Sequence, residues 1–397
     1  MRRLIIFAML LFTLRVEAAP RVLVLKSYHD NLTSLLDAYR ISYIVKRASV
    51  VAGDSSLSGF DAVFIPCGVE QPIEASIQVM AHGQRIQGVA LKDDYAGIDY
   101  KRLQTLLQDF VKSGGRLYAA GYSYKFVEAL GCSLSFFNNF PHYGTSGKIQ
   151  SFLNDDFASF VLHNDLQLNV NYNGWVALQK TNASILAKGY FPTVGGQREG
   201  PVAFFKKYGN GVVYYSVYHS SEDSLYMRYF ILRTAYGMFI DELLQKAWYW
   251  GQSIALSVVD TFKADEYARR YTCTLPGGNV TIYLPSTYPV QVDIFANKKL
   301  LGSWDSGFIN EISFYNPTTQ DVTVNVYQCN RAPYKPFALV IAQGRRILPY
   351  MPVVRVSMGV IAVIALIGLT WRRMHPRKFT GKRRYWFRDG HILHKQK

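Results

Sequence analysis

The segment Phe110-Val-Lys-Ser-Gly-Gly-Arg-Leu-Tyr-Ala-Ala-Gly-Tyr-Ser123 decides how the first half of this chain is interpreted. Apolar residues recur at helical spacing from Asp99 into this segment, and Gly114-Gly115 is typical of a helix end. The apolar run Leu117-Tyr-Ala-Ala-Gly121 predicts a buried strand, followed by a tight turn into a helix over Tyr124–Leu130. The segment therefore indicates a helix–strand–helix unit of an α/β domain.

Strand and helix signals alternate on both sides of this segment. Upstream, Arg21–Leu25 and Asp61–Pro66 predict short buried strands. Downstream, short strand patterns occur over residues 145–217, and one long apolar helix is expected over residues 220–250. We therefore expect an α/β domain over residues 19–252, with a mostly parallel sheet and helices on both of its faces.

From Leu256 onward the pattern becomes all-β. Apolar and polar residues alternate, and turn residues separate the apolar segments at intervals of about ten residues. This pattern predicts a small antiparallel sandwich over residues 253–342. The expected strands are Gly278–Leu284, Val290–Phe295, Ile309–Tyr315, Asp321–Tyr327 and Phe337–Ile341.

The order of helix, Gly-Gly, strand and turn in residues 110–123 resembles the nucleophile-elbow region of the class I glutamine amidotransferase-like superfamily. Phe60-Asp-Ala-Val-Phe-Ile-Pro-Cys-Gly68 is similar to that superfamily's strand and glycine loop, and Tyr214-Tyr-Ser-Val-Tyr-His219 to its late strand ending in a His. The resemblance covers about Arg21–Trp250 and implies a flavodoxin-like or amidotransferase-like parallel sheet. The all-β part resembles the pre-peptidase C-terminal type of β-sandwich.

The resemblance also implies where catalysis would occur. Active members carry a Cys on the elbow that a nearby His activates. The matching position here is Gly121 or a neighbour, and no Cys occurs in that turn. His219 keeps the family's His, with Glu222 shortly after it. The resemblance therefore implies a non-catalytic domain, and the alternative is a hydrolase in which Ser123, His219 and Glu222 form a triad.

Four cysteines lie in the expected ectodomain, an even number that permits two disulfides in an oxidising compartment. Sequence proximity favours the pairs Cys67–Cys132 and Cys273–Cys329, one in each half. The second pair is favoured more, because both of its members lie in strand-like sequence. Cys67 and Cys132 fit equally well as buried free thiols.

Other candidate sites are few. The sequons at Asn31, Asn182 and Asn279 are candidate glycosylation sites if the host glycosylates its exported proteins. The histidines show no ligand spacing such as H-x-x-x-H, and no glycine-rich segment leads into a Lys-Ser or Lys-Thr pair. We therefore expect no bound metal and no cofactor.

Both ends of the chain carry membrane-related signals. A basic start, the apolar stretch Leu4–Leu14 and small residues after it predict a signal peptide over residues 1–18, the alternative being an uncleaved anchor. Residues 352–371 form a mostly apolar run long enough to cross a hydrocarbon core of about 30 Å. After a stalk over residues 343–351 and this run, the basic tail 372–397 belongs in the cytoplasm. These signals predict a single-pass type I protein of the cell surface or an endomembrane, with an extracellular or lumenal ectodomain.

The net charge of +16 does not indicate a nucleic-acid partner. Ten basic residues and one acidic residue lie in Arg372–Lys397, so the excess charge is concentrated in the tail and not on the folded part. The expected partners are membrane lipid, through the apolar run and the basic tail, and a protein bound by the ectodomain.

Three functions follow from these patterns. The favoured hypothesis is a membrane-anchored ectodomain that binds or scaffolds without catalysis. The second is a surface hydrolase that uses Ser123 and His219. The third is a subunit of a membrane complex, because the order of amidotransferase-like domain, β domain, single helix and tail resembles the 48-kDa-type subunit of eukaryotic oligosaccharyltransferase, although the tail here is longer and more basic.

Overall fold

The chain forms two compact units, Met1–Arg346 and Ile347–Lys397. In the second unit, only the antiparallel pair β22 (Phe387–Arg388) and β23 (His391–Ile392) is described. The computed structural model describes residues 19–27, 30–67, 76–81, 84–89, 99–138, 142, 144, 147–170, 175–193, 196–218, 224–284, 289–306, 311–329, 333–344, 387–388 and 391–392.

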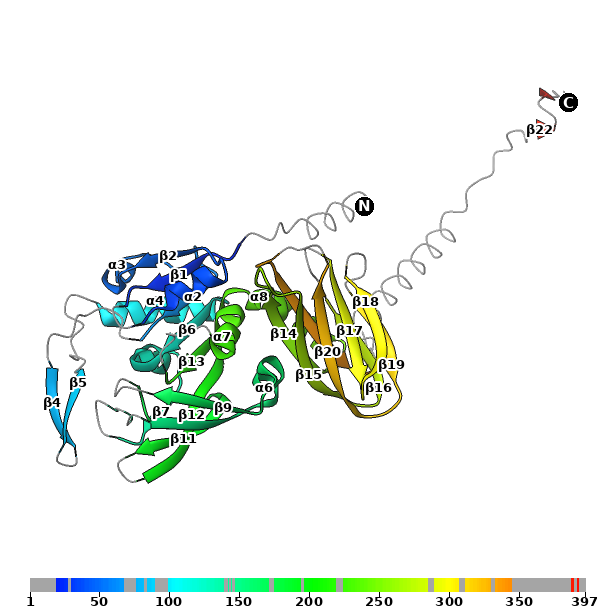
Figure 1. The fold of residues 1–397 in the computed structure, drawn as a ribbon. Coiled ribbons are helices and arrows are strands. Elements are labelled where there is room, and N and C mark those ends of the chain that lie inside the picture. The colour runs from blue at the N-terminus through cyan, green and yellow to red at the C-terminus, as the bar shows by residue number, and fades with distance from the viewer. Residues whose placement is uncertain are drawn as a thin grey trace, which may run out of the picture. The chain divides into compact units, whose positions relative to one another are not determined.

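A nine-stranded sheet forms the first part of the Met1–Arg346 unit (Figure 1). Its strands lie in the order β2-β1-β3-β6-β13-β12-β11-β8-β9. In chain order they are β1 (Val22–Leu25), β2 (Tyr43–Lys46), β3 (Ala62–Ile65), β6 (Arg116–Ala120), β8 (Gly147–Leu153), β9 (Asp165–Val170), β11 (Ser184–Thr193), β12 (Gly196–Tyr208) and β13 (Gly211–Ser216). Two small strand pairs lie outside this sheet: β4 (Ser76–Ala81) with β5 (Gln84–Val89), and β7 (Leu134–Phe136) with β10 (Leu178–Thr181).

Only half of this sheet is parallel. The five strands from β2 to β13 run parallel, and Tyr118 of β6 lies in register with Phe64 on one side and Tyr214 on the other. The strands β12, β11, β8 and β9 continue the same sheet in antiparallel pairs. The prediction of a mostly parallel, amidotransferase-like sheet over residues 19–252 is therefore wrong. The cause is that the short strands of residues 145–217 pair antiparallel. Short connections allow antiparallel pairing, whereas parallel pairing requires a long crossover connection.

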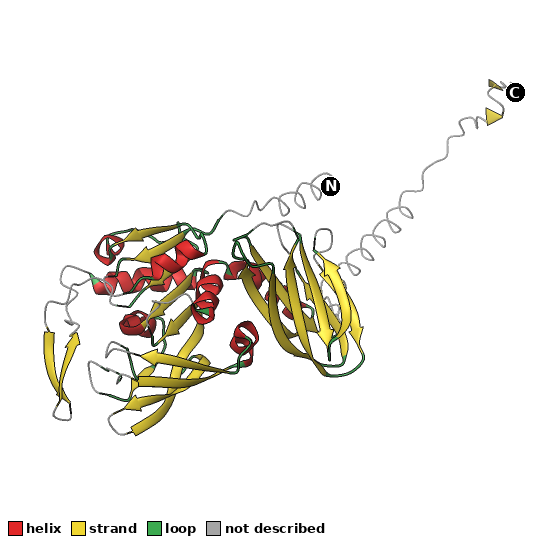
Figure 2. Ribbon diagram, in the orientation of Figure 1, coloured by secondary structure: helices red, strands yellow, loops and turns green. Residues whose placement is uncertain are grey.

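Among the described residues, strands outnumber helices, so the described part of the chain is mainly β (Figure 2). The long helix expected over residues 220–250 is two helices that meet at Tyr236. A Cβ on Gly237 would overlap the Arg116 guanidinium, so a glycine here lets that buried side chain reach the helix junction. The helices are α2 (Leu32–Ala38), α3 (Ala48–Ala52), α4 (Tyr100–Lys112), α5 (Tyr124–Ala129), α6 (Asp155–Val161), α7 (Leu225–Ala235) and α8 (Gly237–Tyr249), with a 3-10 turn η1 (Gly121–Ser123) before α5.

The β-sandwich expected after residue 252 is present. Its two four-stranded sheets have the orders β14-β21-β16-β19 and β15-β20-β17-β18, and every neighbouring pair is antiparallel. The strands are β14 (Ser253–Thr261), β15 (Ala268–Leu275), β16 (Gly278–Tyr283), β17 (Val290–Ala296), β18 (Lys299–Asp305), β19 (Glu311–Asn316), β20 (Gln320–Gln328) and β21 (Pro336–Gln343).

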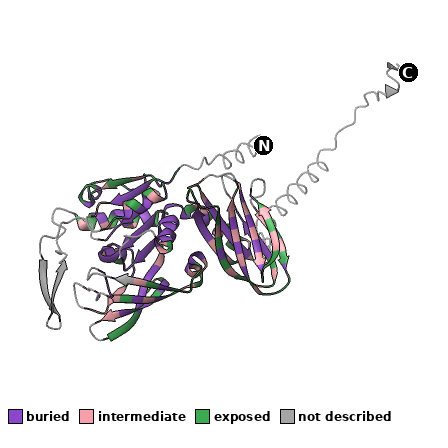
Figure 3. Ribbon diagram, viewed as in Figure 1, coloured by how far each residue is buried: buried purple, intermediate pink, exposed green. Residues whose placement is uncertain are grey.

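Alternation along β21 explains how the sandwich joins the rest of the unit. Leu339 and Ile341 belong to the large core, while Val340 and Ala342 form a second cluster with Ile240 and other residues of α8. Successive strand residues point to opposite faces, so β21 contributes to the sandwich interior on one side and supports α8 on the other. Residues 337–342 of β21 are accordingly all buried; buried residues are purple in Figure 3.

The membrane-related predictions fall largely outside the described residues. Residues 1–18 and 352–371 are not among them, nor is the tail apart from β22 and β23. Within the described part of the chain, no helix combines the length and the apolar character needed to cross a membrane.

Candidate functional site

The tight turn predicted after residues 117–121, at the position that the resemblance assigns to an elbow, is present where β6 ends. Gly121, Tyr122 and Ser123 make one 3-10 turn, and α5 begins directly after it. Gly121 has φ +51°, in the region that favours glycine, and a Cβ there would lie 2.6 Å from the sulfur of Cys67. The turn is sharp, and all three of its residues are buried.

Ser123 is placed in the turn but not as an exposed nucleophile. Its side chain is 1% exposed, and its hydroxyl donates a hydrogen bond to the Pro66 carbonyl at 2.7 Å. A serine nucleophile needs its oxygen open to substrate and its proton directed at a base. The other two members of the predicted triad, His219 and Glu222, lie outside the described residues. The structure therefore shows Ser123 holding the turn to the loop after β3.

Cys67 is the elbow residue that sequence reasoning did not place there. Its Sγ accepts a hydrogen bond from the backbone N–H of Tyr122 at 3.4 Å. Its own N–H donates to Oδ2 of Asp30 at 3.1 Å, and its carbonyl accepts from the Ser27 hydroxyl at 2.5 Å. Burial raises the pKa of the Cys67 thiol far above its usual range, so the thiol is neutral and a poor nucleophile. Cys67 follows β3, which pairs in parallel with β6. Its place directly after a predicted strand was the one sequence signal that could have located Cys67 beside this turn.

Buried tyrosines fill the rest of this edge of the sheet. The hydroxyl of Tyr215 donates to the Gly121 carbonyl at 2.6 Å, and the hydroxyls of Tyr118 and Ser216 are 2.8 Å apart. Burial raises the pKa of both tyrosines well above the usual value, so both stay neutral. Tyr218 is also buried, and its hydroxyl has no hydrogen-bond partner among the described residues. Of these hydroxyl groups, that of Tyr215 on β13 supports the turn directly.

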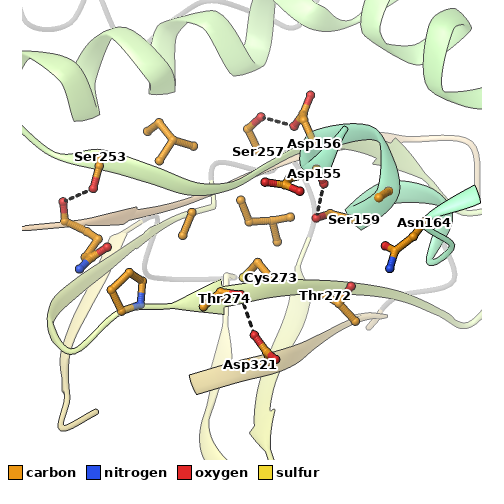
Figure 4. A pocket seen from close by; sticks show the side chains of 16 residues that line it. Asp155, Asp156, Ser159, Asn164, Ser253, Ser257, Thr272, Cys273, Thr274 and Asp321 are labelled. Atoms are coloured by element: carbon orange, nitrogen blue, oxygen red, sulfur yellow. Dashed lines mark hydrogen bonds between the residues drawn. The ribbon is translucent and has the colours of Figure 1, made fainter. Parts of the chain in front are cut away.

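A cleft of about 880 Å³ lies away from the elbow, between α6 and the strands β14 and β15 (Figure 4). It opens where the nine-stranded sheet part meets the sandwich, so its walls come from segments about one hundred residues apart in the sequence. Sequence reasoning missed it for that reason. The lining residues are Asp155, Asp156, Ala158, Ser159, Asn164, Ser253, Ile254, Ala255, Leu256, Ser257, Thr272, Cys273, Thr274, Pro276, Asp321 and Gln343.

The lining of the cleft is acidic and rich in hydroxyl groups. Asp156 accepts hydrogen bonds from Tyr229 at 2.7 Å, Ser257 at 3.0 Å and Arg233 at 3.1 Å, so its charge is balanced. Asp321 accepts one from Thr274 at 2.6 Å. None of the described lining residues is Lys or Arg. Such a surface favours polar ligands that donate hydrogen bonds.

All four cysteines are free thiols in the structure, so neither expected disulfide is formed. The strand register shows why Cys273 and Cys329 do not pair. Cys273 lies opposite Val322 in the antiparallel β15–β20 ladder, and Cys329 comes seven residues after Val322 in the sequence. Seven strand residues span about 23 Å, far beyond the Cα separation of a disulfide. Cys273 lies in a strand as expected, whereas Cys329 directly follows the end of β20, and a strand-like sequence carries no information on register.

The three sequons lie at exposed positions. Asn31 precedes α2, and Asn279 lies in β16. The Asn182 amide donates to the Gly131 carbonyl at 3.3 Å and its oxygen accepts from the Ser133 N–H at 3.1 Å, so this side chain already links two loops. Among the described residues, no three His, Cys, Asp or Glu side chains gather as a metal site would require.

Comparisons with known proteins leave the family open. No family model matches the chain, and no curated protein matches it. Solved structures match parts of it at low similarity. The periplasmic g-type lysozyme inhibitor of Aeromonas hydrophila is 18% identical, with 23% of this chain and 88% of that chain covered and a TM-score of 0.19. The pre-peptidase C-terminal domain of a Bacillus anthracis collagenase is 10% identical, with 22% and 89% covered and a TM-score of 0.20.

Larger matches are mostly to glycosidases. The β-galactosidase of Bacillus circulans sp. alkalophilus is 12% identical, and the match covers 78% of this chain with a TM-score of 0.30. It covers only 41% of that enzyme's own length. Because these TM-scores are all far below 0.5, the neighbours are distant similarities and carry no inference about the fold or function of this chain.

Proposed function

We propose that this chain is an exported, membrane-anchored protein whose folded part binds or scaffolds another molecule without catalysing a reaction. The support for anchoring comes from sequence: a signal-like start over residues 1–18, an apolar run over residues 352–371 and a basic tail. The support for a non-catalytic role comes from the elbow.

The single observation behind the non-catalytic role is that the Ser123 hydroxyl is buried and already engaged in a hydrogen bond. Its proton is donated to the Pro66 carbonyl, and its oxygen is almost fully buried. The sulfur of Cys67 fills the space beside Gly121, where substrate would approach a nucleophile. Acyl transfer needs that space open and a base in contact with the nucleophile. The acidic cleft between α6 and the sandwich offers a concave surface for binding instead.

The catalytic alternative is tested with a fluorophosphonate probe on the full-length protein in detergent. We expect no covalent labelling of Ser123, and hydrolysis of an activated ester at the same slow rate in wild type and Ser123→Ala. Stoichiometric labelling of Ser123 in wild type, lost in Ser123→Ala, would overturn the non-catalytic proposal.

Anchoring is tested separately in sealed membrane vesicles whose cytoplasmic face is outward. Added protease should remove only the tail after residue 371 and leave the rest protected, and alkaline carbonate should fail to extract the protein. Release by carbonate, or degradation of the folded part in sealed vesicles, would refute the predicted topology.

A further inference from the structure

The C-terminal end of α8 carries an unusual group of exposed aromatic side chains. Trp248 is 81% exposed, more than any other large apolar residue among those the structure describes. Tyr249 is also exposed, and its ring meets that of Trp250 edge-on at 5.3 Å between centroids. Apolar residues elsewhere on α8, such as Ile240 and Leu243, pack against the sandwich. The helix therefore buries one face and leaves its last aromatic residues in solvent.

This helix end lies at the point where the chain leaves the folded unit. After α8, the Gln252 amide donates to the carbonyl of Gly344 at 3.3 Å, and a Cβ on Gly344 would lie 3.8 Å from the Gly251 carbonyl oxygen. The Gly251 N–H in turn donates to the Trp248 carbonyl at 2.9 Å. Trp248 and Tyr249 thus lie within one helical turn of Gly251, which is next to Gly344, the last residue described before residue 345.

A third exposed aromatic lies on the other side of the same exit point. Tyr315 is 69% exposed and pairs with Asn279 across the β16–β19 ladder. The carbonyl of Asn279 accepts a hydrogen bond from the Gly344 N–H at 2.9 Å, and all three residues line one shallow surface hollow. The two most exposed large apolar side chains of the described residues, Trp248 and Tyr315, therefore flank Gly344.

The length of chain beyond Gly344 limits how far this surface can be from a membrane. Residues 345–351 separate it from the apolar run that begins at Pro352. A fully extended chain of that length spans roughly 25 Å. The interfacial layers of a bilayer extend several ångströms outside the hydrocarbon core. If the apolar run crosses the bilayer, the aromatic surface is tethered close to the headgroups.

We propose that Trp248, Tyr249 and Tyr315 form a membrane-contact surface that inserts into the headgroup region of the bilayer in which the chain is anchored. This inference rests on the anchoring in the proposed function. Tryptophan and tyrosine favour that region because one end of each ring is apolar and the other forms hydrogen bonds. Arg345 and Arg346 follow directly in the sequence and favour anionic headgroups. The surface would fix the orientation of the folded part on the membrane.

Quenching of tryptophan fluorescence by lipids brominated on their acyl chains near the headgroup tests the proposal. Full-length protein is reconstituted into vesicles of phosphatidylcholine and phosphatidylglycerol, with and without bromine, and the quenched share of emission is compared between variants. The chain has six tryptophans. Trp248→Phe removes one emitter of the six, so the quenched share falls if that emitter is in the bilayer and rises if it is in water.

Two further variants complete the design, and they are matched because each replaces an exposed tyrosine by tryptophan. Tyr315→Trp should raise the quenched share. Tyr267→Trp should lower it, because Tyr267 is 61% exposed but lies at the opposite end of β15 from Leu275. The Leu275 carbonyl accepts a hydrogen bond from the side-chain amide of Asn316, which follows Tyr315 in the sequence. Leu275 is therefore near Tyr315, and the rise per residue along the strand places Tyr267 about 27 Å from Leu275.

The outcomes separate the two proposals. A lower quenched share for Trp248→Phe and a higher one for Tyr315→Trp support the membrane-contact surface. The membrane-contact surface is overturned if Trp248→Phe raises the quenched share, or if Tyr315→Trp and Tyr267→Trp change it equally. This conclusion applies when the protein still floats with vesicles and resists carbonate extraction. Failure to float overturns the anchoring itself and this inference with it.

Discussion

Arg228 joins the two parts of the folded unit through a buried ion network. It lies on α7 and is 2% exposed. Its Nε donates to Asp260 of β14 at 2.8 Å, and its two terminal nitrogens donate to Glu266 at 2.8 and 2.9 Å. It also donates to the carbonyl of Thr261. We therefore predict that Arg228→Ala is among the most destabilising single changes in the chain.

The magnitude follows from what remains after Arg228 is removed. Asp260 is fully buried, and removing one partner of a buried ion pair typically costs about 3–5 kcal/mol because a charge is left uncompensated. Here Arg269 Nε and the Tyr271 hydroxyl still donate to Asp260, at 2.8 and 2.7 Å. We therefore expect the lower end of that range, about 3 kcal/mol in the free energy of unfolding.

Urea unfolding at pH 7, followed by far-ultraviolet circular dichroism of the full chain in detergent, measures this loss. Lys246→Ala is the matched control, since its pair with Glu311 at 2.7 Å is exposed and worth at most about 1 kcal/mol. Arg228→Lys keeps the charge without the paired donors and should fall between wild type and Arg228→Ala. A loss for Arg228→Ala no larger than that for Lys246→Ala would refute the reasoning.

The same network sets a pH dependence. Burial acts to raise the pKa of Asp260, but Arg228 and Arg269, with hydrogen bonds from Tyr271 and the Thr261 N–H, outweigh it and hold that pKa below its usual value. A carboxyl whose pKa is lowered on folding stabilises the protein above its unfolded pKa, and this stability is lost as pH falls through the folded pKa. The loss should therefore begin below about pH 4. It should be shallower in Arg228→Ala, and equal acid slopes in both proteins would contradict this assignment.

Three further predictions concern the elbow and the thiols. Gly121→Ala should reduce the free energy of unfolding by about 2 kcal/mol, because Gly121 has a positive φ and the added Cβ would contact Cys67. In the double variant, Cys67→Ala should restore part of the lost stability. If urea unfolding shows no such recovery, the contact between the two residues is contradicted. Ser123→Ala should lose about 1–2 kcal/mol in the same assay, because the Pro66 carbonyl loses its donor, and a neutral result would show that this hydrogen bond does not stabilise the turn. An aromatic disulfide reagent should label exposed Cys329 in the native, unreduced protein and buried Cys67 only after unfolding, whereas a Cys329 that reacts only after reduction would indicate a disulfide.

Local patterns predicted the elements better than their pairing. The helix predicted from Asp99 into residues 110–123, ending at Gly114-Gly115, corresponds to α4, Tyr100–Lys112. The strand predicted over Leu117–Gly121 corresponds to β6, Arg116–Ala120, one residue earlier. The sandwich also follows from alternation and turn spacing. The long helix after Ser220 was predicted as one element because propensity does not show that the Arg116 side chain occupies the space beside Gly237.

The candidate site was predicted only in part. The sharp turn after β6 follows from its glycine and the flanking strand and helix signals. The contact that closes it does not, because Cys67 and Gly121 are far apart in the chain and meet only when β3 and β6 pair in parallel. The cleft beside α6 was missed for the same reason, since it exists only when α6 docks on β15.

By itself, the sequence determined what depends on neighbours along the chain. This includes the helical and strand periods, the sandwich pattern, the glycine turn, and the apolar and basic segments from which anchoring is proposed. The tertiary structure alone decided strand direction in residues 147–216, the register that keeps Cys273 and Cys329 apart, and the burial of Ser123. It also brought Trp248 and Tyr315 to the exit of the chain at Gly344. The physical reason is that pairing and burial depend on contacts between distant segments, which a local pattern of residues does not encode.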